Sequence, residues 1–256
     1  MALRFTLNGS QRVDYGTAVG LFPDTCLIGA WIYPTTLDST YQVVLEKTPS
    51  GYSDYRGLGI NASTGTISAF MRRGAPFDTG IDMQSAAVLI ANRWQFIAAQ
   101  LDAASAEDLE QQIYYGLERN PAAEVSYLSQ TAGTGSTTPV ATPLTVGNNI
   151  GGGAEGFPGL IQYPFVIEGR PSLKEIVDFQ FNPRIVPGLK FLSILGRPGV
   201  QPVLAGGTHG TVTGAVMAKG EPPILPLSRP AKRYSFASVS GGGGPAKRDG
   251  MFFGVM

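Results

Sequence analysis

Apolar residues along most of this chain fall in short runs that are rich in β-branched and aromatic side chains. Clusters of glycine, proline, asparagine and serine separate the runs, a pattern typical of strands and turns rather than helices. In residues 41–47, Tyr41, Val43 and Leu45 alternate with their neighbours, which predicts a strand with one better-buried face. Further strands are expected at residues 3–7, 57–61, 66–71, 112–117 and 124–128.

Two segments, residues 26–33 and 94–101, are apolar at consecutive positions. Such strands are covered on both sides, so both segments are predicted to be central strands. Trp31 and Trp94 are accordingly predicted to be core residues of the facing sheets. Because many short strands occur without intervening helices, we expect an all-β fold, a two-sheet antiparallel jelly-roll sandwich.

A helix start is marked at Ser172, because Glu175 follows three residues later and apolar residues come next. Serine and glutamate at this spacing form a capping box, in which each side chain satisfies a backbone N–H of the first turn. A short helix is therefore predicted over residues 172–180. A second helical turn is expected within residues 102–111, with its acidic side chains facing solvent.

The composition changes after Ala218. Prolines at positions 222, 223, 226 and 230 favour an extended backbone that neither a helix nor a central strand accepts. Residues 219–256 carry six Lys and Arg residues against two acidic ones, a net charge of +4, whereas residues 1–218 have thirteen against seventeen, a net charge of −4. We therefore predict a jelly-roll domain over residues 1–218 and an extended basic C-terminal arm over residues 219–256.

The arm also holds apolar residues on both sides of a glycine run at residues 241–244. An apolar segment beyond a flexible spacer is expected to dock on another surface. Strand addition or docking of the end of the arm on a neighbouring subunit is the expected mode. The residues predicted to bind a partner are Arg233, Tyr234, Phe236, Met251, Phe252, Phe253, Val255 and Met256.

Charge and cysteine content narrow the class of protein. Lys and Arg number 19, as do Asp and Glu, so the whole chain gives no electrostatic argument for nucleic acid or an anionic membrane as a partner. No run of apolar residues is as long as a membrane span requires. The single cysteine, Cys26, lies in an apolar run and is expected to be a buried, inert thiol. Because the first ten residues, MALRFTLNGS, lack the apolar stretch of a secretory signal, we expect synthesis in a reducing cytoplasm.

Seven segments along the chain form a recognisable series. They are FTLNGS at 5–10, IGAWIYP at 28–34, WQFIAA at 94–99, LTVG at 144–147, GLI at 159–161, SLKEI at 172–176 and HGTVTGA at 209–215. In content and order they resemble the laminin-G-like, concanavalin A-type jelly-roll domains over residues 1–218. The resemblance implies a two-sheet sandwich but says little about function, because that superfamily includes lectins, glycan-cleaving enzymes, adhesion modules and virion proteins.

Catalysis is not predicted. A glycosidase on this fold needs two carboxylates, presented by alternating residues of one strand, and the cluster of Glu107, Asp108 and Glu110 lacks that alternation. A lyase usually relies on histidine with tyrosine, but the only histidine, His209, lies in the family-like HGTVTG turn and is interpreted as structural. The sequence shows no metal-ligand spacing and no calcium loop. We expect no catalytic residues, no metal and no cofactor.

Carbohydrate binding needs no sequence motif, since aromatic platforms and a few hydrogen-bonding side chains are enough. Around the loop at residues 48–57, Tyr41, Tyr52, Tyr55 and Arg56 are the candidate residues for such a platform. The favoured interpretation is that these tyrosines pack on the loop backbone, since tyrosine is commonly half-buried with a hydrated hydroxyl.

Three classes of protein therefore compete: a structural virion protein, a sugar-binding module and a glycan-cleaving enzyme. The first is favoured, because cellular domains of the resembling family are mostly exported, whereas this chain has neither a signal nor a cystine. A bacteriophage protein is made in the host cytoplasm and freed by lysis. We expect a non-enzymatic capsid decoration or cement protein of the virion that binds other virion proteins and its own copies. The alternatives are a tail or tail-fibre component and a lectin-like module for host-surface glycans.

Overall fold

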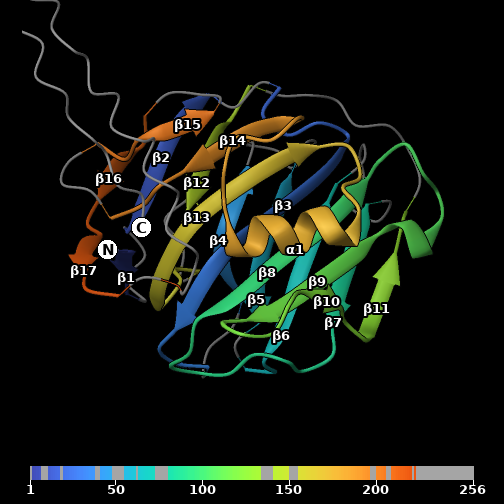
Figure 1. The fold of residues 1–256 in the computed structure, drawn as a ribbon, viewed down its shortest axis with the longest axis horizontal. Coiled ribbons are helices and arrows are strands. Elements are labelled where there is room, and N and C mark those ends of the chain that lie inside the picture. Colours follow the sequence, from blue (N-terminus) through green and yellow to red (C-terminus); the bar gives the residue numbers. More distant parts are fainter. Residues whose placement is uncertain are drawn as a thin grey trace, which may run out of the picture.

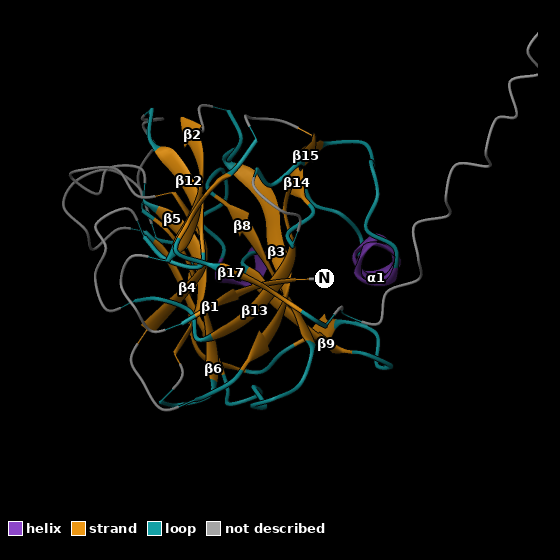
Figure 2. Ribbon diagram, turned by 90° about the vertical axis from the view of Figure 1, so that its left-hand side faces the viewer, coloured by secondary structure: helices purple, strands orange, loops and turns teal. Residues whose placement is uncertain are grey.

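The computed structural model describes residues 2–6, 11–17, 20–37, 41–47, 55–61, 63–72, 80–133, 141–149, 155–196, 200–205, 209–220 and 222. These residues form two antiparallel sheets packed face to face (Figure 1). A single α-helix, α1 (Leu173–Phe181), lies on the side of one sheet that faces away from the other (Figure 2). The predicted all-β, two-sheet antiparallel sandwich is confirmed.

Sheet A has nine strands. Its main order is β10-β9-β8-β3-β13-β1-β17, and β14 pairs with both β13 and β15. The two segments that are apolar on both faces are the neighbouring strands β3 and β8, and β3 also pairs with β13. The strands are β1 (Ala2–Phe5), β3 (Thr25–Pro34), β8 (Gln95–Asp102), β9 (Gln112–Leu117), β10 (Ala123–Glu124), β13 (Gly159–Glu168), β14 (Leu189–Ser193), β15 (Val203–Ala205) and β17 (Val216–Ala218).

Sheet B has eight strands in the order β11-β7-β6-β5-β4-β12-β2-β16. The predicted strand at residues 66–71 matches β6 residue for residue, as the strand at 112–117 matches β9. The strands are β2 (Arg12–Thr17), β4 (Tyr41–Lys47), β5 (Arg56–Asn61), β6 (Thr66–Met71), β7 (Ile81–Ser85), β11 (Tyr127–Thr131), β12 (Pro143–Val146) and β16 (Thr211–Thr213).

The single strand predicted at residues 124–128 is wrong. This segment belongs to two strands, because β10 pairs in sheet A and β11 pairs in sheet B. Val125 and Tyr127 both pack against the core between the sheets, where the chain passes from one sheet to the other. The two-residue alternation of side chains along a strand gives no sign that the chain passes from one sheet to the other.

The faces of β4 also differ from the prediction. A bulge shifts its register between Val43 and Leu45. As a result Val44 and Leu45 both enter the core between the sheets. Tyr41 and Glu46 lie on the opposite face, since they pair with residues of β5 that alternate with the core residues.

The core between the sheets contains Cys26, which is fully buried as expected. Burial raises the pKa of this thiol to about 12, so it stays protonated and unreactive at neutral pH. Tyr15 is also fully buried in this core. Its ring packs edge-on against that of Phe191, with the centroids 4.8 Å apart, and its hydroxyl donates a hydrogen bond to Ser193 Oγ at 2.8 Å.

Trp31 and Trp94 are buried as predicted, but not between the facing sheets. They lie on the outer face of sheet A, in a second apolar cluster with Phe165 and with Ile176 and Phe179 of α1. The Trp31 indole N–H donates to the backbone carbonyl of Gln180 in α1 at 2.9 Å. The prediction was wrong about the face of the sheet on which the two tryptophans lie. Odd- and even-numbered residues of β3 are both apolar, so the sequence does not distinguish its two faces. Only the tertiary fold shows which face the helix covers.

The capping box of α1 is formed as the sequence predicts. Ser172 Oγ accepts from the Glu175 backbone N–H, and Glu175 accepts from the Ser172 backbone N–H. The second helical turn is a short 3-10 helix at Asp108–Glu110, with no buried residue. One or two short helices were expected, and both are present.

The last described residues lead away from β17 across the outer face of sheet A. A Cβ at Gly220 would lie 3.4 Å from Leu160 Cδ1, and Leu160 belongs to the outer apolar cluster. Residues 223–256 lie outside the described residues, so the predicted arm and domain boundary stay predictions. Within the described part of the chain, no helix has the length and apolar character to cross a membrane.

Candidate functional site

The outward face of sheet B differs from that of sheet A, which α1 covers. Alternate residues of a strand point to opposite faces, and the outward positions of sheet B are mostly small and polar, with a few aromatic residues. From the pairing registers they include Tyr41, Val43, Glu46, Gly57, Gly59, Asn61, Thr66, Ser68, Phe70, Asp82, Gln84 and Thr145. Such a face has the side-chain types that hydrogen-bond and stack on sugars.

Three aromatic rings lie together on this face. The ring centroid of Tyr55, just before β5, is 4.3 Å from that of Phe70 in β6, and the ring planes are inclined by 32°. The Tyr41 ring lies 6.0 Å from the Phe70 ring at 56°. Phe70 is buried, whereas Tyr41 and Tyr55 are partly exposed. The two tyrosines therefore present aromatic surface around a buried phenyl ring, and we call these three residues the aromatic cluster.

Two glycines of β5 make room for these rings. A Cβ at Gly57 would lie 2.6 Å from Cζ of Phe70, and one at Gly59 would lie 2.5 Å from Cζ of Tyr41. Both distances are too short for any side chain. Because glycine stands at both outward positions, the rings lie directly on the backbone of the strand.

A carboxylate is buried beside the rings. Glu46 has no exposed surface, and its Oε2 accepts a hydrogen bond from the Tyr55 hydroxyl at 3.1 Å. Burial, reinforced by the charge of Glu46, raises the pKa of Tyr55 well above its ordinary value. Tyr55 therefore keeps its proton at neutral pH, and the contact with Glu46 fixes the orientation of its ring.

The hydroxyl of Tyr41 is buried and has no hydrogen-bond partner among the described residues. Burial raises the pKa of Tyr41, and the charges of Glu46, Glu155 and Asp82 raise it further. An unsatisfied buried polar group costs about 1–3 kcal/mol.

The rim of the site is acidic. The exposed Asp82 carboxylate lies 4.0 Å from the Arg72 guanidinium. Partial burial raises the pKa of Asp82, and Arg72 opposes this shift. Glu155 also acts electrostatically on Tyr41. Among the described residues of this part of the sheet, the carboxylates of Glu46, Asp82 and Glu155 thus outnumber the guanidinium of Arg72.

The structure brings two of the four predicted sugar-binding residues together, Tyr41 and Tyr55. Tyr52 lies outside the described residues. Arg56 is a correction, because it points into the interior on the same face of β5 as Leu58 and Ile60. Its guanidinium is buried, donates to the carbonyl oxygens of residues 22 and 23 at 2.7 and 3.0 Å, and pairs with an Asp24 oxygen at 2.9 Å. Arg56 thus fixes a turn between the sheets and is not part of the surface.

Sequence reasoning missed Glu46, Phe70 and Asp82, which belong to three different strands. A signal existed in the sequence RGLGIN of β5, where glycine occupies the two outward positions on either side of Leu58. Alternating glycines in a strand often mark a close approach of other groups. Their partners follow only from the strand order.

His209 supports the structural interpretation. It is exposed, and its Nδ1 accepts a hydrogen bond from the Val203 backbone N–H at 3.2 Å, which ties the segment before β16 to β15. Within the described ranges, no group of three His, Cys, Asp or Glu side chains could hold a metal ion.

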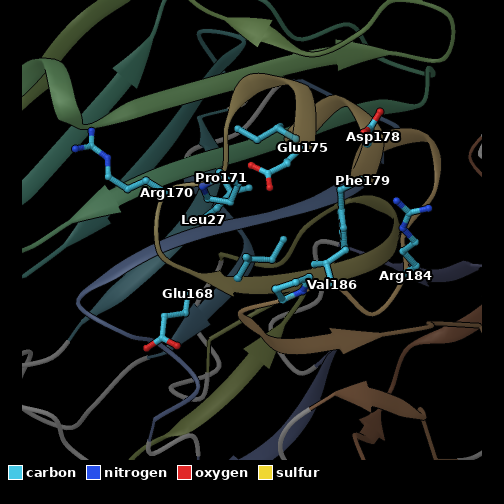
Figure 3. A pocket seen from close by; sticks show the side chains of 12 residues that line it. Leu27, Glu168, Arg170, Pro171, Glu175, Asp178, Phe179, Arg184 and Val186 are labelled. Atoms are coloured by element: carbon cyan, nitrogen blue, oxygen red, sulfur yellow. The ribbon is translucent and has the colours of Figure 1, made fainter.

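Two cavities lie elsewhere. The larger, about 360 Å³, lies beside α1 on the outer face of sheet A (Figure 3). The other, about 320 Å³, opens at the edge of the sandwich near β16 and β17, with Leu3, Val212 and Met217 in its lining. The eight predicted partner-binding residues, from Arg233 to Met256, all lie outside the described residues, so the structure does not place them.

No family model matches this chain, and no curated protein matches it in sequence. Solved structures share its fold. A candidate carbohydrate-binding protein from Bacteroides ovatus superposes with a TM-score of 0.58 at 15% identity, over 88% of this chain and 61% of that one. A heptameric SAP-like pentraxin from Limulus polyphemus superposes with a TM-score of 0.52 at 12% identity, over 82% and 94% of the two chains.

The full-length tailspike protein 2 of an Escherichia coli O157:H7 bacteriophage also shares the fold, with a TM-score of 0.52 at 16% identity over 75% of this chain. The match covers 26% of the tailspike, so this chain corresponds to a part of that protein. The match to the Bacteroides protein likewise spans less than two thirds of that protein's length. At such identities the likeness establishes the jelly-roll sandwich and nothing about chemistry.

Proposed function

We propose that this protein is a non-catalytic carbohydrate-binding protein whose sugar site is the outward face of sheet B around Tyr41 and Tyr55. The observation that carries the proposal is the aromatic cluster, with its rings lying on glycines of β5 and the buried Glu46 beside them. Sugar rings stack their C–H faces on aromatic side chains and exchange hydrogen bonds with nearby polar groups. The surrounding outward residues, among them Asn61, Ser68 and Gln84, supply such groups.

The ligand class follows from the charge of the site. The described carboxylates of Glu46, Asp82 and Glu155 all act on Tyr41 and raise its pKa. A glycan that carries carboxylates or sulfates would be repelled. The proposed ligand is therefore a neutral glycan built from hexoses or N-acetylhexosamines.

The absence of catalysis is part of the proposal. Glu46 is fully buried and engaged by the Tyr55 hydroxyl, which suits a positioning role better than proton transfer to a substrate. Incubation with neutral and acidic polysaccharides should release neither reducing ends nor unsaturated products. Turnover that disappears in a Glu46→Gln variant would contradict this part of the proposal.

The binding experiment compares the two outer faces. Isothermal titration calorimetry with neutral oligosaccharides found by glycan-array screening should show binding that Tyr55→Ala weakens about tenfold or more, the usual effect of losing a central aromatic contact. The matched control is Tyr33→Ala on sheet A, since Tyr33 is also partly exposed and packs against another ring, that of Trp94, at 5.7 Å. Binding that survives Tyr55→Ala but not Tyr33→Ala would overturn the assignment.

We propose further that the protein acts as part of a bacteriophage particle, as a capsid decoration protein or as a tail component. The segment of the basic arm around Arg233, Tyr234 and Phe236 supports this, because it suits attachment to other virion proteins. A tailspike that shares the fold is compatible with the tail location. Gold-labelled antibody against the protein should mark capsids or tails in electron micrographs, and particles without label on either would contradict the proposal.

A further inference from the structure

The groove beside α1 is the larger of the two cavities. Its floor is apolar and consists of Leu27 and Ile167 from sheet A and Ile176 and Phe179 from the helix, with Val186 from the segment that follows. Figure 3 shows Phe179 pointing from α1 toward the strand below. A cavity of about 360 Å³ is large enough for a few apolar side chains.

The rim of this groove carries charges of both signs, with one more acidic than basic residue in its lining. Glu168, Glu175 and Asp178 line it, together with Arg170 and Arg184. Arg170 is neutralised by Glu110 at 2.9 Å and by Asp102 at 3.5 Å, and Figure 3 shows it directed away from the groove. The side chains of Glu168 and Asp178 are about half exposed although each pairs with a lysine. A basic, apolar segment is complementary to such a groove.

The chain itself contains a segment of this kind. Residues 251–256 read MFFGVM, and Lys247, Arg248 and Asp249 come shortly before them, with a net charge of +1. The whole of residues 219–256 carries +4 against −4 for residues 1–218. The edge cavity near β16 and β17 offers no such complement, because none of the residues that line it is charged.

The length of the intervening chain also fits. The described chain passes Leu160 on the outer face of sheet A and reaches Pro222, which is buried. Leu160 and the groove residue Ile167 lie seven residues apart on β13, about 23 Å at the rise of a strand. Fully extended, the 28 residues at positions 223–250 span at most roughly 90–100 Å. Residues 251–256 can therefore reach the groove.

We propose that the groove beside α1 is the docking site for residues 251–256 of the same chain. Phe252 and Phe253 enter the apolar floor, and Lys247 and Arg248 lie against the carboxylates of the rim. The docked segment covers apolar surface that α1 and sheet A leave open. This inference is independent of the proposed sugar site, since it uses the opposite face of the sandwich.

The first test measures hydrogen exchange in the full-length protein by mass spectrometry. Replacing Phe252 and Phe253 together with serine should make the amides of residues 173–187 exchange severalfold faster, because the groove loses its cover. The matched control replaces Tyr234 and Phe236 with serine, which removes two aromatic rings from the same arm and should leave this exchange unchanged. Equal exchange in both variants and the parent would overturn the proposal.

The second test is a disulfide cross-link that also identifies the donor chain. With Val186→Cys and Phe253→Cys in one chain, mild oxidation should give a cross-linked monomer, since Cys26 is buried and does not compete. A cross-linked dimer would show that a second copy fills the groove and would overturn docking within one chain. The control pair, Val200→Cys with Phe253→Cys, probes the edge cavity, and a cross-link there alone would also overturn the proposal.

Discussion

On sheet A the positions that point away from the core carry Trp31, Phe96 and Phe165, whereas on sheet B the corresponding positions include Gly57, Gly59 and Ser68. Both sheets follow the same two-residue period, and both have an apolar inner face. An apolar outer face needs a cover, and α1 supplies it. The described outer positions of sheet B are mostly small and polar, and under the proposed function the aromatic cluster among them binds the ligand. The chemistry of the outer positions therefore separates the sheet that α1 covers from the sheet that is proposed to bind a glycan.

The largest expected effect comes from the covered face. Trp31→Ala should destabilise the protein by about 3–5 kcal/mol, because a large buried side chain and its hydrogen bond to α1 are lost. Chemical denaturation measures this change. Sugar affinity of the folded fraction should stay the same, and a stable Trp31→Ala protein that has lost only its sugar affinity would reverse the roles of the two faces.

A smaller but functional effect is expected on sheet B. In Gly57→Ala the new Cβ would lie 2.6 Å from Cζ of Phe70, so the ring must move. We expect about 1–3 kcal/mol of destabilisation from overpacking, together with a clear loss of sugar affinity. The control is Gly29→Ala in β3, where the new Cβ would lie 2.5 Å from Cζ of Phe165 on the outer face of sheet A and should leave sugar affinity unchanged. Unchanged affinity in Gly57→Ala would show that ring placement is irrelevant to binding.

Removing the N-terminal cap of α1 is a milder test of the helix that covers sheet A. Ser172→Ala removes one half of the capping box and should cost about 1 kcal/mol. Hydrogen exchange should accelerate in α1 and leave β4 and β5 unaffected. Equal acceleration in both sheets would show that the two faces do not behave independently.

The smallest effect concerns alkaline pH. Burial and Glu46 raise the pKa of Tyr55 in the folded protein, whereas a tyrosine in the unfolded chain ionises near pH 10. Above that pH the unfolded chain releases a proton that the folded chain keeps, so stability falls as pH rises. Melting temperatures at pH 8 and pH 10.5 should differ less in Tyr55→Phe than in the parent. A larger difference in the variant would contradict the assigned shift.

Local signals in the sequence predicted much of the fold. The alternation at residues 66–71 and the capping box at Ser172 are determined by a few neighbouring side chains, and both are confirmed. The side on which Trp31 is buried depended on where a distant helix packs. The prediction for Arg56 was wrong because a charged residue was expected at the surface. In the structure its guanidinium is buried and donates hydrogen bonds to the carbonyl groups of residues 22 and 23.

The candidate site was predicted only in part for a similar reason. Tyr41 and Tyr55 are close in sequence and were grouped together, but Phe70 and Asp82 come from later strands. Their proximity depends on the order β7-β6-β5-β4 of sheet B and on the bulge in β4. Neither the order of strands nor a bulge is encoded in a residue pattern that can be read locally.

The most direct measurement is an NMR titration of the isotope-labelled protein with a neutral oligosaccharide. The account predicts that amide shifts change in β4, β5 and β6, around Tyr41, Tyr55 and Phe70, and that α1 and β13 stay unperturbed. Shift changes confined to α1, β3 and β13 would place the ligand on the covered face and contradict the central claim.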